Sequence, residues 1–179
     1  MRTRTALAVA LVAAVLGIGS VPAGAGATPL PVHLDRSPTA AEWAAGTVAC
    51  LVQVTGTAPS GEYTTSPMQC WIVAHGDRTT PWTHEASAAA AGVLSSSFSA
   101  VGYHFDGLNY TGSYITVSGG VCGGGWLNLS WDWVDRISST ISPCSVKHFD
   151  GYNLTGSVET TGTANLSYMD NRTNSIQYV

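Results

Sequence analysis

A ten-residue stretch of this chain occurs twice. Residues 104–113 read HFDGLNYTGS and residues 148–157 read HFDGYNLTGS, so eight of ten positions are identical at a spacing of 44 residues. A fixed spacing of this kind indicates one supersecondary unit used twice. The Asp-Gly pair between aromatic and aliphatic residues indicates a hairpin, and the glycines argue against a helix. The chain is therefore expected to contain two copies of a β-hairpin.

A second and looser similarity follows each repeated stretch. Residues 128–141 read NLSWDWVDRISSTI, and residues 165–178 read NLSYMDNRTNSIQY. Both stretches open with Asn-Leu-Ser-aromatic and both contain Arg-x-x-Ser. The first has one residue more between the shared serines, which suggests a β-bulge. Each copy then holds four short strands, which is the content of a Greek key.

Together these features resemble the Greek-key motif of the βγ-crystallin superfamily, two of which make one domain. The resemblance covers about residues 100–179. It implies an all-β, βγ-crystallin-like double Greek-key sandwich that acts as a non-enzymatic binding or structural module. Secreted bacterial members of the superfamily include proteins that look like peptidase inhibitors and killer toxins. The motif residues are Phe105, Gly112 and Ser139 in the first copy and Phe149, Gly156 and Ser175 in the second.

The resemblance also implies calcium sites in the polar turns. The family pattern Asn/Asp-Asn/Asp-x-x-Ser/Thr-Ser supplies carboxylate, amide, carbonyl and hydroxyl oxygens, and calcium takes six to eight such ligands. The first turn departs from this pattern at Val134 and the second at Asn174. Few carboxylates and the arginines inside the turns predict weak, unequal sites, with a Kd of about 10⁻⁴–10⁻³ M. The implied ligands are Asp135 and Ser138 in the first turn, and Asp170, Asn171 and Asn174 in the second.

A purely structural role for the turns is the alternative. Ser139 and Ser175 would then fix the hairpins by hydrogen bonds, while the turn aspartates would be solvated. His104 and His148 occupy equivalent positions in the two copies. We therefore expect these histidines to share a structural role and not a catalytic one.

The first 27 residues have the features of a secretory signal. Arg2 and Arg4 precede an apolar run at residues 6–18, and small residues follow at 23–27, as in cleaved signal peptides. The run is short for a membrane span, so we expect a soluble, secreted monomer. Without the two arginines, five Lys and Arg remain against eleven Asp and Glu, a net charge of −6. That charge argues against nucleic acid and anionic membranes as partners.

The four cysteines predict disulfides formed in an oxidising compartment. Three pairings exist; we favour Cys50–Cys70, which flank one segment, and Cys122–Cys144, which lie in the repeat region. Each bond would close a loop of about 20 residues and contribute about 3 kcal/mol by loop entropy. A metal site is the alternative, and the lack of a Cys-x-x-Cys spacing argues against it.

Residues 30–97 carry no motif that we recognise as a family signature. A short helix is expected to begin near Pro38 and to run through Trp43. Residues 47–56 and 69–75 are β-rich without strict alternation, so both faces of these strands are expected to be covered. The expected divisions are a signal peptide (1–27), a leader (28–46), an N-terminal β-containing subdomain (47–97) and the repeat domain (98–179).

Two further functions stand beside a calcium-binding module. An inhibitor of an extracellular peptidase could use loop 56–67, because a tethered loop loses little entropy on binding. A small secreted hydrolase has its best candidate site at His75, Asp77 and His84, but His-Glu-x-x-His and Gly-x-Ser-x-Gly are absent. A carbohydrate or an extracellular protein is the expected partner class. Trp131 and Trp133 share a face if their strand is regular, either in the core or as an exposed pair that binds sugar rings.

Overall fold

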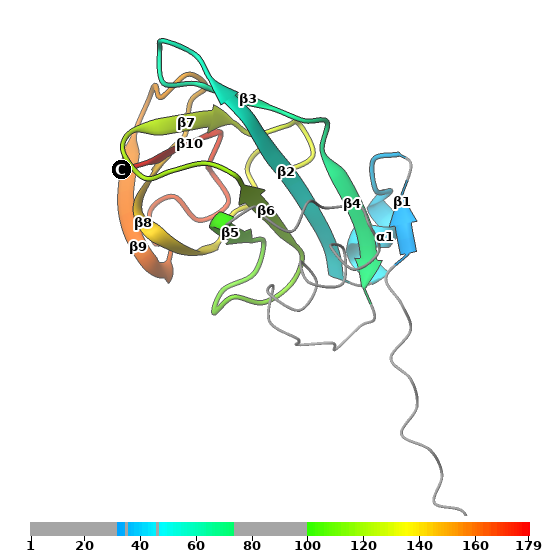
Figure 1. The fold of residues 1–179 in the computed structure, drawn as a ribbon. Coiled ribbons are helices and arrows are strands. Elements are labelled where there is room, and N and C mark those ends of the chain that lie inside the picture. Colours follow the sequence, from blue (N-terminus) through cyan, green and yellow to red (C-terminus); the bar gives the residue numbers. More distant parts are fainter. Residues whose placement is uncertain (1–31, 35, 46, 74–99) are drawn as a thin grey trace, which may run out of the picture.

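The described backbone consists of β-strands and their connecting loops, with one short helix (Figure 1), which confirms the all-β prediction. The computed structural model describes residues 32–34, 36–45, 47–73 and 100–179. The predicted signal sequence and the candidate hydrolase residues His75, Asp77 and His84 lie outside this part of the chain. Within the described residues, no helix has the length and apolar character needed to span a membrane.

The chain enters the fold through strand β1 (Val32–Leu34) and helix α1 (Ala40–Ala45). Thr39 and Glu42 form a capping box: the Thr39 amide donates to Glu42 Oε2 at 2.7 Å, and the Glu42 amide donates to Thr39 Oγ1 at 3.3 Å. This reciprocal arrangement satisfies amides that the first helical turn leaves unpaired. The predicted short helix is confirmed, with Trp43 on its partly buried side.

All the described strands form one continuous sheet. Its order is β1-β4-β2-β6-β5-β8-β10-β7, and in addition β3 pairs with β2 and β9 with β8. Neighbouring strands are antiparallel except β2 and β6, which are parallel. The strands are β2 (Thr47–Thr57), β3 (Tyr63–Thr65), β4 (Gln69–Val73), β5 (Ala100–Phe105), β6 (Tyr114–Ser118), β7 (Gly125–Asn128), β8 (Ser139–Phe149), β9 (Val158–Asn165) and β10 (Ser175–Tyr178).

Strand β8 bends the sheet around the core. Its first residues pair with β5 and its last residues with β10. Between them, the register against β9 shifts from Ile141 to Val146. Pro143 lies in this interruption, where its missing amide hydrogen costs no ladder bond. The expected two-layered sandwich is therefore built from a single curled sheet.

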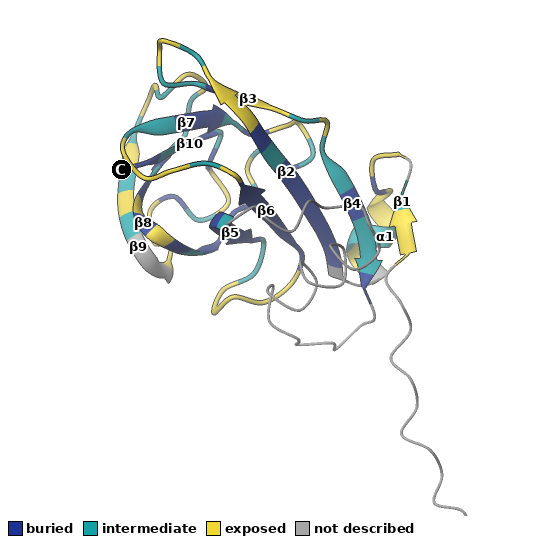
Figure 2. Cartoon of the chain, viewed as in Figure 1, coloured by how far each residue is buried: buried dark blue, intermediate teal, exposed yellow. Residues whose placement is uncertain are grey.

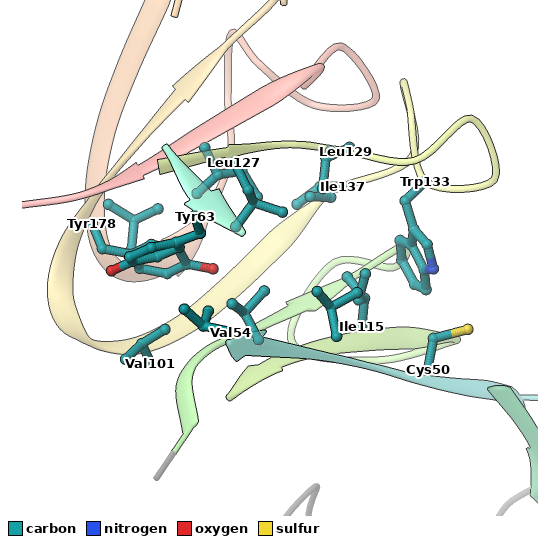
Figure 3. Close-up of a cluster of buried hydrophobic side chains, with 14 of the residues drawn as sticks. Cys50, Val54, Tyr63, Val101, Ile115, Leu127, Leu129, Trp133, Ile137 and Tyr178 are labelled. Carbon is teal, nitrogen blue, oxygen red and sulfur yellow. The ribbon is translucent and has the colours of Figure 1, made fainter. Parts of the chain in front are cut away.

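The curl brings the β7 end of the sheet back to the turn before β3. Glu62 and Trp126 form a parallel bridge, and the Trp126 amide donates to Gly61 O at 3.0 Å. Apolar side chains fill the enclosed space, and Figure 3 shows those of Val54, Ile115 and Leu127 among them. Exposed residues concentrate in the connecting loops (Figure 2).

Residues 47–73, the described part of the expected subdomain 47–97, share the sheet and the core with the repeats. Strand β2 runs hydrogen-bonded along β6, and Val48, Val52 and Val54 pack in the main core. Ala49 packs in a second cluster with Tyr103 and Phe105. As expected, both faces of this strand are covered.

Both favoured disulfides are confirmed. Cys50–Cys70 joins facing residues of β2 and β4, and Cys122–Cys144 ties a glycine-rich loop to the interruption of β8. The two bonds indicate an oxidising environment. They fix β4 to β2 and the loop before β7 to β8.

Candidate cation sites between the two copies

The two hairpin loops have the same internal geometry. In the first, Asp106 Oδ1 accepts the Ser113 amide at 2.7 Å, and the Gly107 amide donates to Thr111 O at 3.0 Å. In the second, Asp150 Oδ1 accepts the Ser157 amide at 2.6 Å. The aspartate closes a loop wider than the two-residue turn that Asp-Gly predicts. Burial raises the pKa of Asp106, which its hydrogen bonds and Arg136 oppose.

Each loop holds two non-glycine residues in the left-handed region. These are Asn109 and Tyr110 in the first copy, and Asn153 and Leu154 in the second, with φ between 55° and 60°. A conformation this costly needs support from its surroundings. Ser139 Oγ accepts the Tyr110 amide at 3.0 Å and donates to Gly107 O at 2.6 Å. Ser175 makes the equivalent bonds to Leu154 and Gly151.

The arginines inside the turns pair with the hairpin aspartates of their own copy. Arg172 Nη2 lies 2.9 Å from Asp150 Oδ2, and Arg136 Nη1 lies 3.9 Å from Asp106 Oδ2. In a purely structural turn these arginines were expected to pair with the turn aspartates, whereas their partners are the hairpin aspartates. The positive charges of the two arginines therefore lie at the hairpin loops, and the oxygen atoms of the polar turns have other partners.

One oxygen cluster surrounds Asn174. Its Nδ2 donates to Asp135 Oδ1 at 3.0 Å, to Asp150 O at 2.8 Å and to Arg172 O at 3.2 Å. The carboxylate comes from the first turn, and the two carbonyls and the amide come from the second copy. We call these four groups the Asn174 cluster.

The second cluster is related to the first by exchange of the two copies. Ser138 Oγ donates to Asp106 O at 3.1 Å and contacts Asn171 Oδ1 at 3.4 Å. Asn171 corresponds to Asp135 in the turn, and both have a φ near 55°. We call these three groups the Ser138 cluster. It contains no carboxylate, whereas the Asn174 cluster contains one.

The candidate ligands predicted from the sequence are paired between the two copies and not within one copy. Asp135 lies with Asn174 and Asn171 lies with Ser138, so each cluster takes one side chain from each turn. Asp170 enters neither cluster through a hydrogen bond; it accepts one from Asn171 Nδ2 at 3.2 Å. The turn pattern does not include the carbonyls of Asp106 and Asp150. Their identity in the two copies was the available signal, but a carbonyl ligand leaves no side-chain signature.

The donor set fits a hard cation of modest affinity. Carboxylate, amide, hydroxyl and carbonyl oxygens are the ligands calcium takes, and a low count of carboxylates gives weak sites. For calcium to replace the amide donor, the Asn174 side chain would turn its Oδ1 toward the cluster, an exchange of two nearly isosteric atoms. The described residues contain no group of three or more His, Cys, Asp or Glu side chains that could hold a metal ion.

A buried polar chain lies beneath the two turns. Thr140 Oγ1 lies 2.9 Å from His104 Nδ1 and 3.1 Å from His148 Nε2. The chain continues to Tyr178 OH at 2.8 Å from His104 and to Thr173 Oγ1 at 3.3 Å from His148. Burial holds the pKa of both histidines low, that of His148 at about 4. Both imidazoles are therefore neutral at pH 7 and are held by hydrogen bonds within this chain.

The expectation that Trp131 and Trp133 share a face is wrong. Both lie in a turn, where the Trp133 amide donates to Ser130 O at 2.8 Å, and not in a strand. Trp133 is fully buried, and the edge of its ring meets Trp43 of α1 with centroids 5.5 Å apart. Trp131 is 86% exposed.

Comparisons with known proteins give one structural match. No family model and no curated protein matches this chain. A search of solved structures finds a double mutant of a βγ-crystallin domain from Clostridium beijerinckii, in which two threonines are replaced by serine. The match has 20% identity and a TM-score of 0.36, and it covers 45% of this chain and 97% of the other.

Proposed function

We propose that this protein is a secreted, non-enzymatic βγ-crystallin-like module that binds calcium weakly at the Asn174 and Ser138 clusters. The observation that carries the proposal is the convergence of three oxygens, one of them a carboxylate, around Asn174 Nδ2. The signal-like residues 1–27 and the two disulfides support export.

Binding of calcium is expected to stabilise the fold. Each cluster joins both turns to a hairpin carbonyl, so an ion held there bridges the two copies. A ligand that binds only the native state adds RT ln(1 + [L]/Kd) to stability, which is about 2.7 kcal/mol at a concentration a hundredfold above Kd. The Asn174 cluster is expected to bind more tightly than the Ser138 cluster, because it has the carboxylate.

The test compares thermal melts in chelator and in calcium, up to about 10 mM, for the wild type and two matched variants. Asp135→Asn removes the charge of the Asn174 cluster while asparagine still tolerates the left-handed backbone. Asp170→Asn removes the same charge just outside the clusters. Calcium is expected to raise the Tm of the wild type and of Asp170→Asn, and to raise that of Asp135→Asn much less. A wild-type Tm that calcium leaves unchanged would refute the proposal.

Inhibition of an extracellular peptidase is the second candidate function. The observation in its favour is a protruding turn at residues 58–62, closed within the Cys50–Cys70 segment. Trp126 Nε1 donates to Ser60 O at 3.2 Å, and the Ala58 amide donates to Glu62 O at 2.7 Å. A loop held this way loses little entropy on binding. Inhibition of a protease panel that Ser60→Arg abolishes would support it, and no inhibition would exclude it.

A further inference from the structure

Trp131 is the most exposed large apolar side chain among the described residues. Its position in the repeat explains why. Tyr168 follows the same Asn-Leu-Ser sequence in the second copy, where it packs under the Arg172 guanidinium at 4.6 Å and donates to Ser157 Oγ at 3.0 Å. In the first copy, Arg136 instead covers Trp43 of α1 at 4.2 Å.

Because the first copy has an extra residue, Trp131 does not pack against the arginine of its own copy as Tyr168 does. Trp133 and Met169 are the fully buried residues that follow the two Leu-Ser pairs. Two residues lie between Ser130 and Trp133, whereas one lies between Ser167 and Met169. The longer turn carries Trp131 outward, and Trp43 takes the place over Arg136. The fold therefore has no packing use for the indole of Trp131.

The turn that carries Trp131 adjoins a pocket. Ser130 Oγ lies 3.6 Å from the Met68 sulfur, and Met68 lines a pocket of about 270 Å³ together with His33, Ser37 and Gln69. Arg36 also lines it, but Glu42 neutralises the guanidinium through bonds of 2.7 and 2.8 Å. The pocket thus combines apolar surface with polar groups, and the charge of Arg36 at its edge is compensated by Glu42.

We propose that Trp131 and this pocket form a binding site for a neutral β-1,4-linked polysaccharide. The equatorial linkages of such a chain make a flat ribbon whose faces are apolar C–H groups, and these complement the negative face of an indole ring. Pockets for small ligands pair apolar surface with a few polar groups that fix orientation. Gln69 and Ser37 supply such groups for sugar hydroxyls. The site is independent of the cation clusters.

The test is calorimetric titration of the full mature chain with cellohexaose and with chitohexaose, which distinguish glucose from N-acetylglucosamine chains. We expect one of them to bind, equally in chelator and in calcium. Trp131→Ala is expected to weaken binding by about tenfold or more, as for a tryptophan at the centre of an interface, while Trp131→Tyr retains most of the affinity. Gln69→Ala should also weaken binding.

Tyr168→Ala is the matched control, because it removes the equivalent aromatic residue of the other copy. Its affinity is expected to equal that of the wild type. Circular dichroism checks that each variant is folded. The proposal is overturned if neither oligosaccharide binds at about 5 mM, a concentration above the Kd of most weak specific complexes, or if folded Trp131→Ala binds as the wild type does.

Discussion

Replacing Gly112 or Gly156 by valine is expected to lower the free energy of unfolding by about 3 kcal/mol. Both glycines have φ near 80°, where a β-branched residue is strongly disfavoured. A Cβ at either position would also overlap the aspartate oxygen that closes the hairpin, Asp106 Oδ1 or Asp150 Oδ1. Strain and loss of the closing hydrogen bond therefore act together. Urea unfolding of each variant measures the loss.

Gly123→Val is the matched control for this prediction. Gly123 also has a positive φ, of 130°, but an added Cβ would meet no atom within 4 Å. It isolates the backbone strain from the overlap, so its loss should be smaller than that of Gly112→Val. Wild-type stability in both Gly112→Val and Gly156→Val would contradict the role assigned to these loops.

Acidification from pH 7 to pH 5 is expected to destabilise the fold through its two buried histidines. His104 and His148 are buried and neutral, and burial places their native pKa values below the unfolded value near 6.5, at about 4 for His148. At these two histidines, protons bind in this pH range only in the unfolded chain. The stability that the histidines contribute is therefore complete above pH 6.5 and is lost toward pH 4. For His148 alone the loss by pH 5 is about 2 kcal/mol.

His104 adds a loss of the same sign. Its pKa is lowered mainly by burial and further by the neighbouring His148, whereas Glu159 slightly opposes the shift of His148. Urea unfolding at pH 7, 6 and 5 measures the slope, and His148→Gln, which cannot titrate, should reduce it. Equal slopes in the wild type and this variant would show that His148 does not contribute.

The repeated motif made much of the fold predictable. Two hairpins with a glycine at the same offset required one repeated backbone geometry, and Gly112 and Gly156 have nearly equal φ. The cysteine positions gave the right disulfides because each pair lies close in sequence. Integration of β2 could not be predicted, since parallel pairing with β6 joins segments more than 60 residues apart and has no local sequence signal.

The candidate ligands were predictable by residue type but not by partner. The turn pattern identified Asp135, Ser138, Asn171 and Asn174, yet it grouped them by copy. The structure groups Asp135 with Asn174 because the turns of the two copies face each other, so that the Asp135 amide also donates to Thr173 O at 3.0 Å. Pairing across copies is a property of the packed domain. Trp131 was expected in a strand but lies in a turn. The composition of this turn resembles that of a strand, although it lacks regular alternation.

The most direct test of the central claim is a calcium titration followed through the side-chain amide resonances of Asn171 and Asn174. If calcium binds at the two clusters, both sets of resonances shift together with saturation in the range of about 10⁻⁴–10⁻³ M expected for weak extracellular sites. The Asn174 amide is expected to shift more, because its nitrogen gives up three acceptors when the oxygen turns inward. Asn174 resonances that stay unchanged up to about 10 mM calcium, above that range, would contradict the claim.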